Sequence, residues 1–205
     1  MFAQTTEAPK TTLCRLFYAY GSDKCPQIFH SYSEQYHALL NCRRPAVRNV
    51  IEIGIGSSEL MKPIVGDRYV VGASLRAWRD YFPHAEIYGF DINTRSLFDD
   101  ERITCLHADQ SSPESLETAI AQIHRQNGDV GFDLIVDDGS HLIPDMITSY
   151  NTLYRHLRTG GIYIIEDIKK ADLDVFTGMN LHGGRILLVH AGLSEWDAFI
   201  AVEKA

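Results

Sequence analysis

The chain has 205 residues, of which 45% are hydrophobic and 22% are charged, and its formal net charge is −8 at pH 7. This length suffices for one α/β domain with its own core, and the composition is ordinary for a soluble globular protein. Nucleic-acid-binding proteins usually present a clustered basic face, which this acidic chain without basic runs does not offer, so we expect no nucleic-acid partner.

The sequence offers no membrane-spanning or secretory signal. Its longest apolar runs are the size of a β-strand, as at residues 162–165. The first ten residues lack the charged and then apolar layout of a signal peptide. The four cysteines form no Cys-x-x-Cys pair and match no zinc pattern; they are Cys14, Cys25, Cys42 and Cys105. We therefore expect a cytoplasmic protein with no membrane partner and with unpaired thiols.

The elements predicted along the chain fall into two regions. Residues 1–46 are expected to form an N-terminal helical cap, with helices around 13–20 and 31–40. Residues 47–205 are expected to form one structural unit in which strands alternate with helices. The predicted strands cover residues 47–55, 87–90, 103–106, 132–136, 162–165, 185–190 and 197–202. The predicted helices cover residues 76–82, 113–128 and 144–157, with Ser112 as the N-cap of the second and Gly160-Gly161 ending the third.

This alternation predicts the fold class α/β, with a doubly wound and mainly parallel sheet. The last two strands are close enough in sequence to form a hairpin, so one C-terminal antiparallel strand is expected. In such sheets ligands bind at the carboxyl ends of the strands. Polar residues follow five predicted strands there: Glu52, Asp91, Asp109, Asp137, Asp138, Glu166 and Asp167.

The first three strand ends suggest a nucleoside site. Gly54 and Gly56 follow the first strand, where glycine lets the chain turn tightly and a ligand approach the backbone. Asp91, at the end of the second strand, can accept hydrogen bonds from both ribose hydroxyls, and Asp109 is placed to meet an adenine amino group. A dinucleotide is disfavoured, because Glu59 replaces the third glycine of the fingerprint and Asp91 comes too late in the chain.

The next two strand ends suggest the reactive part of the site. Asp137-Asp138-Gly-Ser-His141 ends one strand, and Glu166-Asp167 ends the next. We interpret these carboxylates as converging without a nearby lysine or arginine, so that they would repel one another unless a cation bound them. Oxygen-rich ligation suits Mg²⁺ or Mn²⁺. His141 could then take a proton from a substrate hydroxyl whose pKa the metal lowers.

Each of these candidate site residues also has a simpler, structural interpretation. Gly-x-Gly and Asp-Asp-Gly turns occur widely at strand ends, and a single histidine is more often structural than catalytic. Lys169-Lys170 could neutralise the acidic site or form a solvated loop. The tyrosines of the N-terminal region could line a substrate site or pack in the core; they are Tyr18, Tyr20, Tyr32 and Tyr36.

Taken together, the motifs of residues 47–205 resemble those of the class I S-adenosylmethionine-dependent methyltransferases, which have a Rossmann-like sheet. The resemblance rests on Glu52-Ile-Gly54-Ile-Gly56, on Asp91 and on the closing antiparallel strand. It implies that Gly54 and Gly56 lie near the methionine part of the cofactor, that Asp91 holds the ribose and that Asp109 holds the adenine. Glu52 and Asp137 complete the expected cofactor-binding set.

A narrower resemblance joins the chain to the metal-dependent sugar O-methyltransferases of the macrocin and mycinamicin type. It rests on Asp138-Gly-Ser-His141 with Glu166-Asp167, and on an opening segment with Tyr20-Gly-Ser-Asp-Lys24, His30, Tyr32 and Tyr36. It implies that Mg²⁺ is bound by Asp138, Glu166 and Asp167, that His141 is the catalytic base beside Asp138, and that the opening segment covers the cofactor.

Three functions remain open from the sequence. The first is an S-adenosylmethionine- and Mg²⁺-dependent O-methyltransferase acting on a hydroxyl of a small molecule, a sugar or glycosylated natural product. The second is an oxidoreductase or hydroxylase on the same fold that uses a dinucleotide or a metal. The third is a silent cofactor-binding scaffold, against which the acidic cluster with His141 argues. The sequence also leaves a homo-oligomer open.

Overall fold

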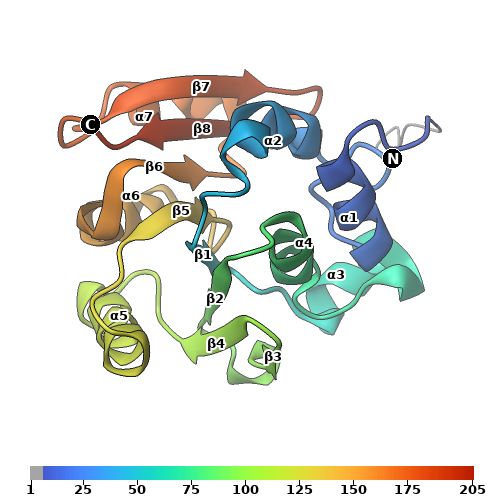
Figure 1. Ribbon diagram of the computed structural model, residues 1–205. Helices are drawn as coiled ribbons and strands as arrows, with labels where there is room; N and C mark the ends of the chain where they lie inside the picture. Colours follow the sequence, from blue (N-terminus) through green and yellow to red (C-terminus); the bar gives the residue numbers. More distant parts are fainter. Residues whose placement is uncertain (1–6) are drawn as a thin grey trace.

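The computed structural model describes residues 7–205; residues 1–6 of the predicted cap lie outside this range. One eight-stranded sheet runs through the protein in the order β3-β4-β2-β1-β5-β6-β8-β7 (Figure 1). The strands are β1 (Asn49–Ile53), β2 (Glu86–Asp91), β3 (Asp99–Asp100), β4 (Ile103–His107), β5 (Phe132–Asp137), β6 (Leu157–Ile165), β7 (Arg185–Ala191) and β8 (Ala198–Glu203).

The sheet is mainly parallel, as predicted. Strands β4, β2, β1, β5 and β6 are parallel neighbours, and β8 pairs antiparallel with both β6 and β7. From the central β1 the chain moves outward through β2 and β4, then returns across β1 to β5 and β6. The strand order therefore reverses between β1 and β5, which is where α/β sheets open a crevice for ligands.

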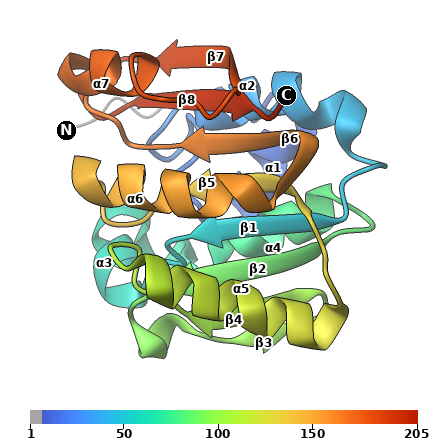
Figure 2. The same cartoon turned by 90° about the vertical axis from the view of Figure 1, so that its left-hand side faces the viewer.

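Helices cover both faces of the sheet, as Figures 1 and 2 show from two directions. On one face lie α1 (Thr12–Tyr20), α2 (Tyr32–Leu40) and α4 (Ala73–Tyr81). On the other lie α5 (Pro113–Asn127), α6 (Ile143–Leu153) and α7 (Leu173–Thr177). Helix α3 (Ser58–Val65) follows the turn after β1. No helix of residues 7–205 is long and apolar enough to cross a membrane.

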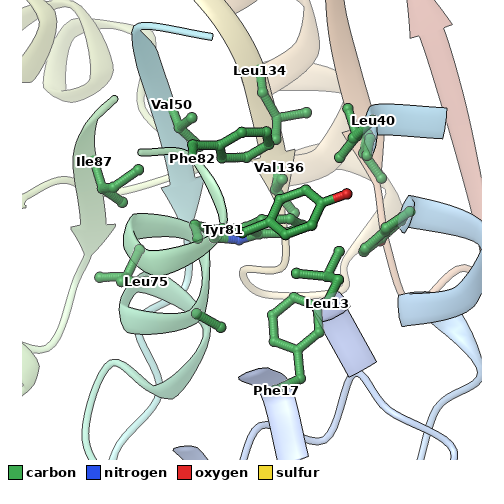
Figure 3. Packing of buried hydrophobic residues seen from close by; sticks show 14 of the residues in the cluster. Leu13, Phe17, Leu40, Val50, Leu75, Tyr81, Phe82, Ile87, Leu134 and Val136 are labelled. Atoms are coloured by element: carbon green, nitrogen blue, oxygen red, sulfur yellow. The ribbon is translucent and has the colours of Figure 1, made fainter. Parts of the chain in front are cut away.

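Alternating side chains of the strands pack into two separate cores. Val50 belongs to the core under α1, α2 and α4, whereas its neighbour Ile51 belongs to the core under α5 and α6. This is the two-residue period of a strand that is covered on both faces. Figure 3 shows the first core, whose cluster contains Leu13 and Phe17 of α1 together with Val136 of β5. Buried side chains of α1 and α2 therefore share this core with the sheet.

Several helix and strand limits differ from the sequence prediction, and the short elements β3 and α7 were not predicted. The prediction that Gly160-Gly161 ends a helix is wrong, because α6 stops at Leu153 and β6 begins at Leu157. The glycines lie inside β6, where the Gly160 N–H donates to the Lys204 carbonyl. Helix α3 was not predicted, because none of its residues is buried and its apolar side chains leave no pattern of core packing.

Candidate functional site

The site lies where the strand order reverses, at the carboxyl ends of β1 and β5. A cavity of about 520 Å³ opens there. Its wall includes the turn after β1, the apolar face of α3, the loop after β5 and residues 22–24 of the N-terminal segment. The opening segment thus reaches the cavity, and its covering of the cofactor stays a prediction. The site residues that line it are Lys24, His30, Gly54, Gly56, Asp138, His141 and Asp167.

Gly54 brings two turns of the site together. It has a φ of 91°, a region that side-chain-bearing residues rarely adopt. A Cβ atom added there would stand 1.9 Å from the carbonyl oxygen of Asp138. Only glycine therefore lets the loop after β5 approach the turn after β1 so closely, and the predicted glycine site and acidic site share one wall.

Three potential ligands meet at the reactive side of the cavity. One side-chain atom from each of Asp138, His141 and Asp167 lies within 4.8 Å of the other two. His141 and Asp167 have φ values of 57° and 52°, a strained conformation that often marks functional positions. The Nδ1 atom of His141 is buried and has no hydrogen-bond partner among residues 7–205. The oxygens of the two carboxylates suit a divalent cation, and the unpartnered imidazole nitrogen beside them can accept a proton.

Lys24 lies among the carboxylates. Its Nζ is 2.5 Å from Asp138 Oδ2, 2.5 Å from Glu166 Oε2 and 3.5 Å from Glu52 Oε1. The premise that no lysine or arginine is near these acids was therefore wrong. Burial acts to lower the pKa of Lys24, but Asp138, Glu166 and Glu52 outweigh it and raise that pKa well above its ordinary value. Lys24 remains a cation inside the protein.

Glu52 and Glu166 lie beneath the cavity, not in its wall. Both are almost completely buried. Glu52 accepts a hydrogen bond of 2.6 Å from the Trp78 indole, and Glu166 accepts one of 2.6 Å from the Tyr36 hydroxyl. Burial raises the pKa of Glu52 to about 7 and that of Glu166 well above its ordinary range, against the opposing effect of Lys24. The single positive charge of Lys24 does not fully offset the cost of burying these two carboxylates.

Asp167 is oriented by the N-terminal segment. Tyr32 donates a hydrogen bond of 2.6 Å to its Oδ1, and His30 Nε2 stands 3.4 Å from the same oxygen. Its other oxygen is 3.9 Å from His141 Nε2. Tyr32 and Tyr36 are fully buried members of the core, so of the two interpretations of the tyrosines the core one is confirmed for this pair.

Asp137 supports the loop after β5 from below. It is fully buried, accepts a hydrogen bond of 2.6 Å from Gln110 and is also bound by the hydroxyl of Ser149. Burial raises its pKa to about 7. Gln110 in turn accepts a hydrogen bond of 2.8 Å from the Ser140 backbone. Asp137 thus faces the protein interior, where it positions the loop that carries Asp138 and His141.

The two acids expected at the nucleoside lie at the ends of their strands but outside the cavity lining. Asp91 accepts backbone hydrogen bonds of 2.9 Å from Ile55 and 2.7 Å from Asn93. Asp109 accepts from the backbone and hydroxyl of Ser111, which lowers its pKa. Asp91 therefore fixes the turn that contains Gly54 and Gly56.

A second hollow of about 250 Å³ adjoins the first. The two share His141, Leu142, Asp167 and Trp196. The second is otherwise mainly apolar, and the ammonium of Lys169 lies 4.5 Å from the centre of the Trp196 ring. The reactive residues thus stand at the junction of two hollows.

Sequence reasoning missed the roles of Lys24 and Gln110. Lys24 was noticed only as part of the opening motif, and it lies 114 positions from Asp138 in the chain. The pair Lys169-Lys170 was considered as the neutralising charge instead, yet Lys170 binds the carbonyl of Gly192. The one signal in the sequence is that Lys24 is the only lysine between Lys10 and Lys62, inside the opening motif.

Comparison with known proteins gives a consistent picture. The family model described as "Methyltransferase domain" matches residues 72–186, more than half of the chain. The 8-demethyl-8-alpha-L-rhamnosyl tetracenomycin-C 2'-O-methyltransferase of Streptomyces olivaceus is 34% identical over 81% of this chain and 40% of its own length. The mycinamicin VI 2''-O-methyltransferase of Micromonospora griseorubida is 36% identical over 73% of this chain and 34% of its own length.

Among solved structures, the MycE methyltransferase of mycinamycin biosynthesis, in complex with Mg, SAH and mycinamycin VI, is similar with a TM-score of 0.71. It is 28% identical, and the match covers 95% of this chain and 55% of that one. The chain therefore spans less than half of each of these two curated relatives and about half of the matched structure. None of these proteins is named as an oxidoreductase, so the oxidoreductase alternative gains no support.

Proposed function

The chain belongs to the methyltransferase domain family, and from this premise we propose that it transfers a methyl group from S-adenosylmethionine to a hydroxyl group of a small molecule. The acceptor class that we propose is a sugar or a sugar-bearing natural product, because both curated relatives described above are named for O-methyl transfer to such compounds. We also propose that a divalent cation, Mg²⁺ or Mn²⁺, takes part.

The observation that carries this proposal is the junction of the two hollows at His141 and Asp167. A methyl transfer needs two molecules whose reacting atoms meet in a fixed orientation. The larger hollow, with Gly54 and Gly56 in its wall, suits the cofactor. The smaller one, with Trp196 at its edge, suits the acceptor, because an aromatic ring offers a flat apolar surface to a sugar.

For the cofactor we propose that Gly54 and Gly56 contact the methionine part, while Asp91 and Asp109 receive the ribose and the adenine. Asp91 already holds the amide of Ile55, so its contact with a ribose would also fix the glycine turn. Glu52 and Asp137, being buried, would act by positioning this wall.

For the metal we propose Asp138, Glu166 and Asp167. Asp138 and Asp167 offer oxygens beside His141, and Glu166 shares Lys24 with Asp138. When bound, the cation would supply positive charge that lowers the pKa of the acceptor hydroxyl and orients its oxygen. The chain's own part is to hold these carboxylates in place through Lys24, Tyr32 and Tyr36.

We propose that His141 is the general base. Its Nδ1 has no hydrogen-bond partner among residues 7–205 and the residue lines both hollows. It would take the proton of the acceptor hydroxyl as the oxygen forms its bond to the methyl carbon. The bond between that carbon and the cofactor sulfur breaks at the same time, and its electron pair goes to sulfur, which leaves S-adenosylhomocysteine.

We further propose a cytoplasmic location, which is consistent with four free cysteines. The absence of a nucleic-acid partner and the formation of a homo-oligomer stay predictions.

Binding of S-adenosylhomocysteine to metal-stripped protein, measured by calorimetry without and then with Mg²⁺, tests the proposal. We expect binding in both states and a separate heat for Mg²⁺ that disappears in Asp138→Asn. Asp145→Asn, which changes another partly buried acid in the first turn of α6, is the matched control. A protein that binds no S-adenosylhomocysteine in either state would refute the methyltransferase assignment.

A further inference from the structure

Lys24 is unusual because it is a lysine that is 2% exposed. Lysine is almost never fully buried unless it is paired, since removing an ammonium from water is costly. Here its Nζ has three carboxylates around it, from β1, from the loop after β5 and from the end of β6. The lysine itself comes from the N-terminal segment between α1 and α2. It is thus enclosed by oxygens from three separate parts of the sheet.

We propose that Lys24 is a fixed internal cation that lets the site fold before the divalent ion binds. This inference rests on the proposed function, in which a divalent cation binds at Asp138 and its neighbours. Without Lys24, Glu52, Asp138 and Glu166 would converge with no positive charge between them. With Lys24 present, the acids already have one shared partner, so the metal is needed for the reaction and not for assembly of the site.

Lys24 also offsets part of the negative charge that a metal ion would meet at this site. Among residues 7–205, Asp138 is the one acid that contacts Lys24 and also belongs to the group with His141 and Asp167. Its Oδ2 binds Lys24, at a distance of 2.5 Å. Because two cations a few ångströms apart repel each other, Lys24 weakens divalent binding at this group and keeps the ion exchangeable.

The test is the variant Lys24→Met, which keeps most of the length of the side chain and removes the charge. In the presence of a chelator we expect its thermal midpoint to fall by about 10 °C relative to the wild type, because buried carboxylates lose their counter-ion. Mn²⁺ should restore roughly half or more of that loss, whereas the wild type should respond by only a few degrees. Titration of metal-stripped protein should give Mn²⁺ binding about tenfold tighter in Lys24→Met.

Two further variants make the test specific. Lys24→Met with Glu52→Gln removes one charge of each sign, so it should melt above Lys24→Met in chelator and respond less to Mn²⁺. Lys10→Met is the matched control, since Lys10 lies in the same N-terminal region with its side chain 59% exposed and pairs with Glu7 and Glu34 at the surface. It should behave as the wild type.

The inference is overturned if Lys24→Met loses the same stability with and without Mn²⁺, or if it binds Mn²⁺ more weakly than the wild type. Either result would mean that Lys24 only packs or orients its neighbours. The proposed metal site fails separately, if neither the wild type nor Lys24→Met takes up Mn²⁺. In that case the variant Lys24→Met with Glu52→Gln still tests the inference. Its restored charge balance should raise its thermal midpoint in chelator above that of Lys24→Met, and this comparison needs no metal.

Discussion

At the scale of single residues, the strained backbone of His141 and Asp167 connects the structure to the proposed chemistry. A left-handed conformation costs free energy for residues that carry a Cβ, so the surroundings must hold it. For His141 those surroundings are the loop fixed by Gln110 and Asp137, and for Asp167 they are Tyr32 and His30. Both side chains are thereby directed to the junction of the hollows.

A change at His141 tests its role as the base. We expect His141→Ala to lower kcat by about 100-fold or more, which is the usual contribution of a positioned base. The affinity for S-adenosylhomocysteine, measured by calorimetry, should change less than about twofold, because the proposed base acts on the acceptor hydroxyl and not on the cofactor. His84→Ala, at an exposed histidine, should retain full turnover. Normal turnover of His141→Ala would remove the residue from the mechanism.

The site residues that could be predicted from sequence are those that follow strands. Parallel strands end at one edge of a sheet, so Asp138 and Asp167 could be placed together from their positions alone. Lys24 could not, because its neighbours are set by how the segment between α1 and α2 crosses the sheet edge. The same holds for Gln110, whose partners depend on the packing of α6 against β5.

At the scale of elements, the helices and strands that could be predicted are those that bury a regular apolar pattern. Strands such as β5 and helices such as α5 bury regular apolar patterns, and Ser112 and Pro113 mark the start of α5 as the sequence suggested. Helix α3 turns Leu60, Met61 and Ile64 toward the cavity instead of a core. Its apolar residues therefore serve a ligand site, and a search for core periodicity does not detect them.

The hairpin of β7 and β8 is tied to the N-terminal segment through Asp197. Its oxygens accept hydrogen bonds from the backbone and the hydroxyl of Ser31, and His30 Nδ1 lies 3.5 Å away. Burial opposes ionisation, but the nearby His30 and the hydrogen bonds from Ser31 lower the pKa of Asp197 to about 2. The ordinary pKa of this group is 3.8. Because the pKa is lower in the folded protein, ionisation of Asp197 stabilises the folded state.

This shift predicts how stability depends on pH. The contribution of Asp197, at most about 2 kcal/mol, is present above its ordinary pKa and is lost as the pH falls through about 4 toward 2. We expect Asp197→Asn to lower the free energy of unfolding at pH 7 by about that amount, and by ~1 kcal/mol less at pH 3. Urea unfolding at both values measures this. A difference between variant and wild type that does not change with pH would contradict the assignment.

At the scale of the whole molecule, helices α1 and α2 of the N-terminal segment share a core with the sheet that the segment was predicted to cap. Five of its side chains are at most 1% exposed and lie in the core that also contains Val50 and Ile87: Leu13, Phe17, Tyr32, Tyr36 and Leu40. Burial of each is worth about 1.5–3 kcal/mol, so together they contribute on the order of 10 kcal/mol. This is comparable to the entire free energy of unfolding of a typical domain.

We therefore expect that a chain beginning at residue 47 does not fold. It would expose Trp78, which is fully buried and meets Phe17 in an edge-to-face contact with ring centres 5.0 Å apart. It would also leave Glu52 and Glu166 without Lys24. Near-ultraviolet circular dichroism and thermal melting should detect neither fixed aromatic packing nor a cooperative transition. A cooperative melt with retained S-adenosylhomocysteine binding would instead make residues 1–46 a separable cap, because the sheet and its remaining helices would then be sufficient for both folding and the cofactor site.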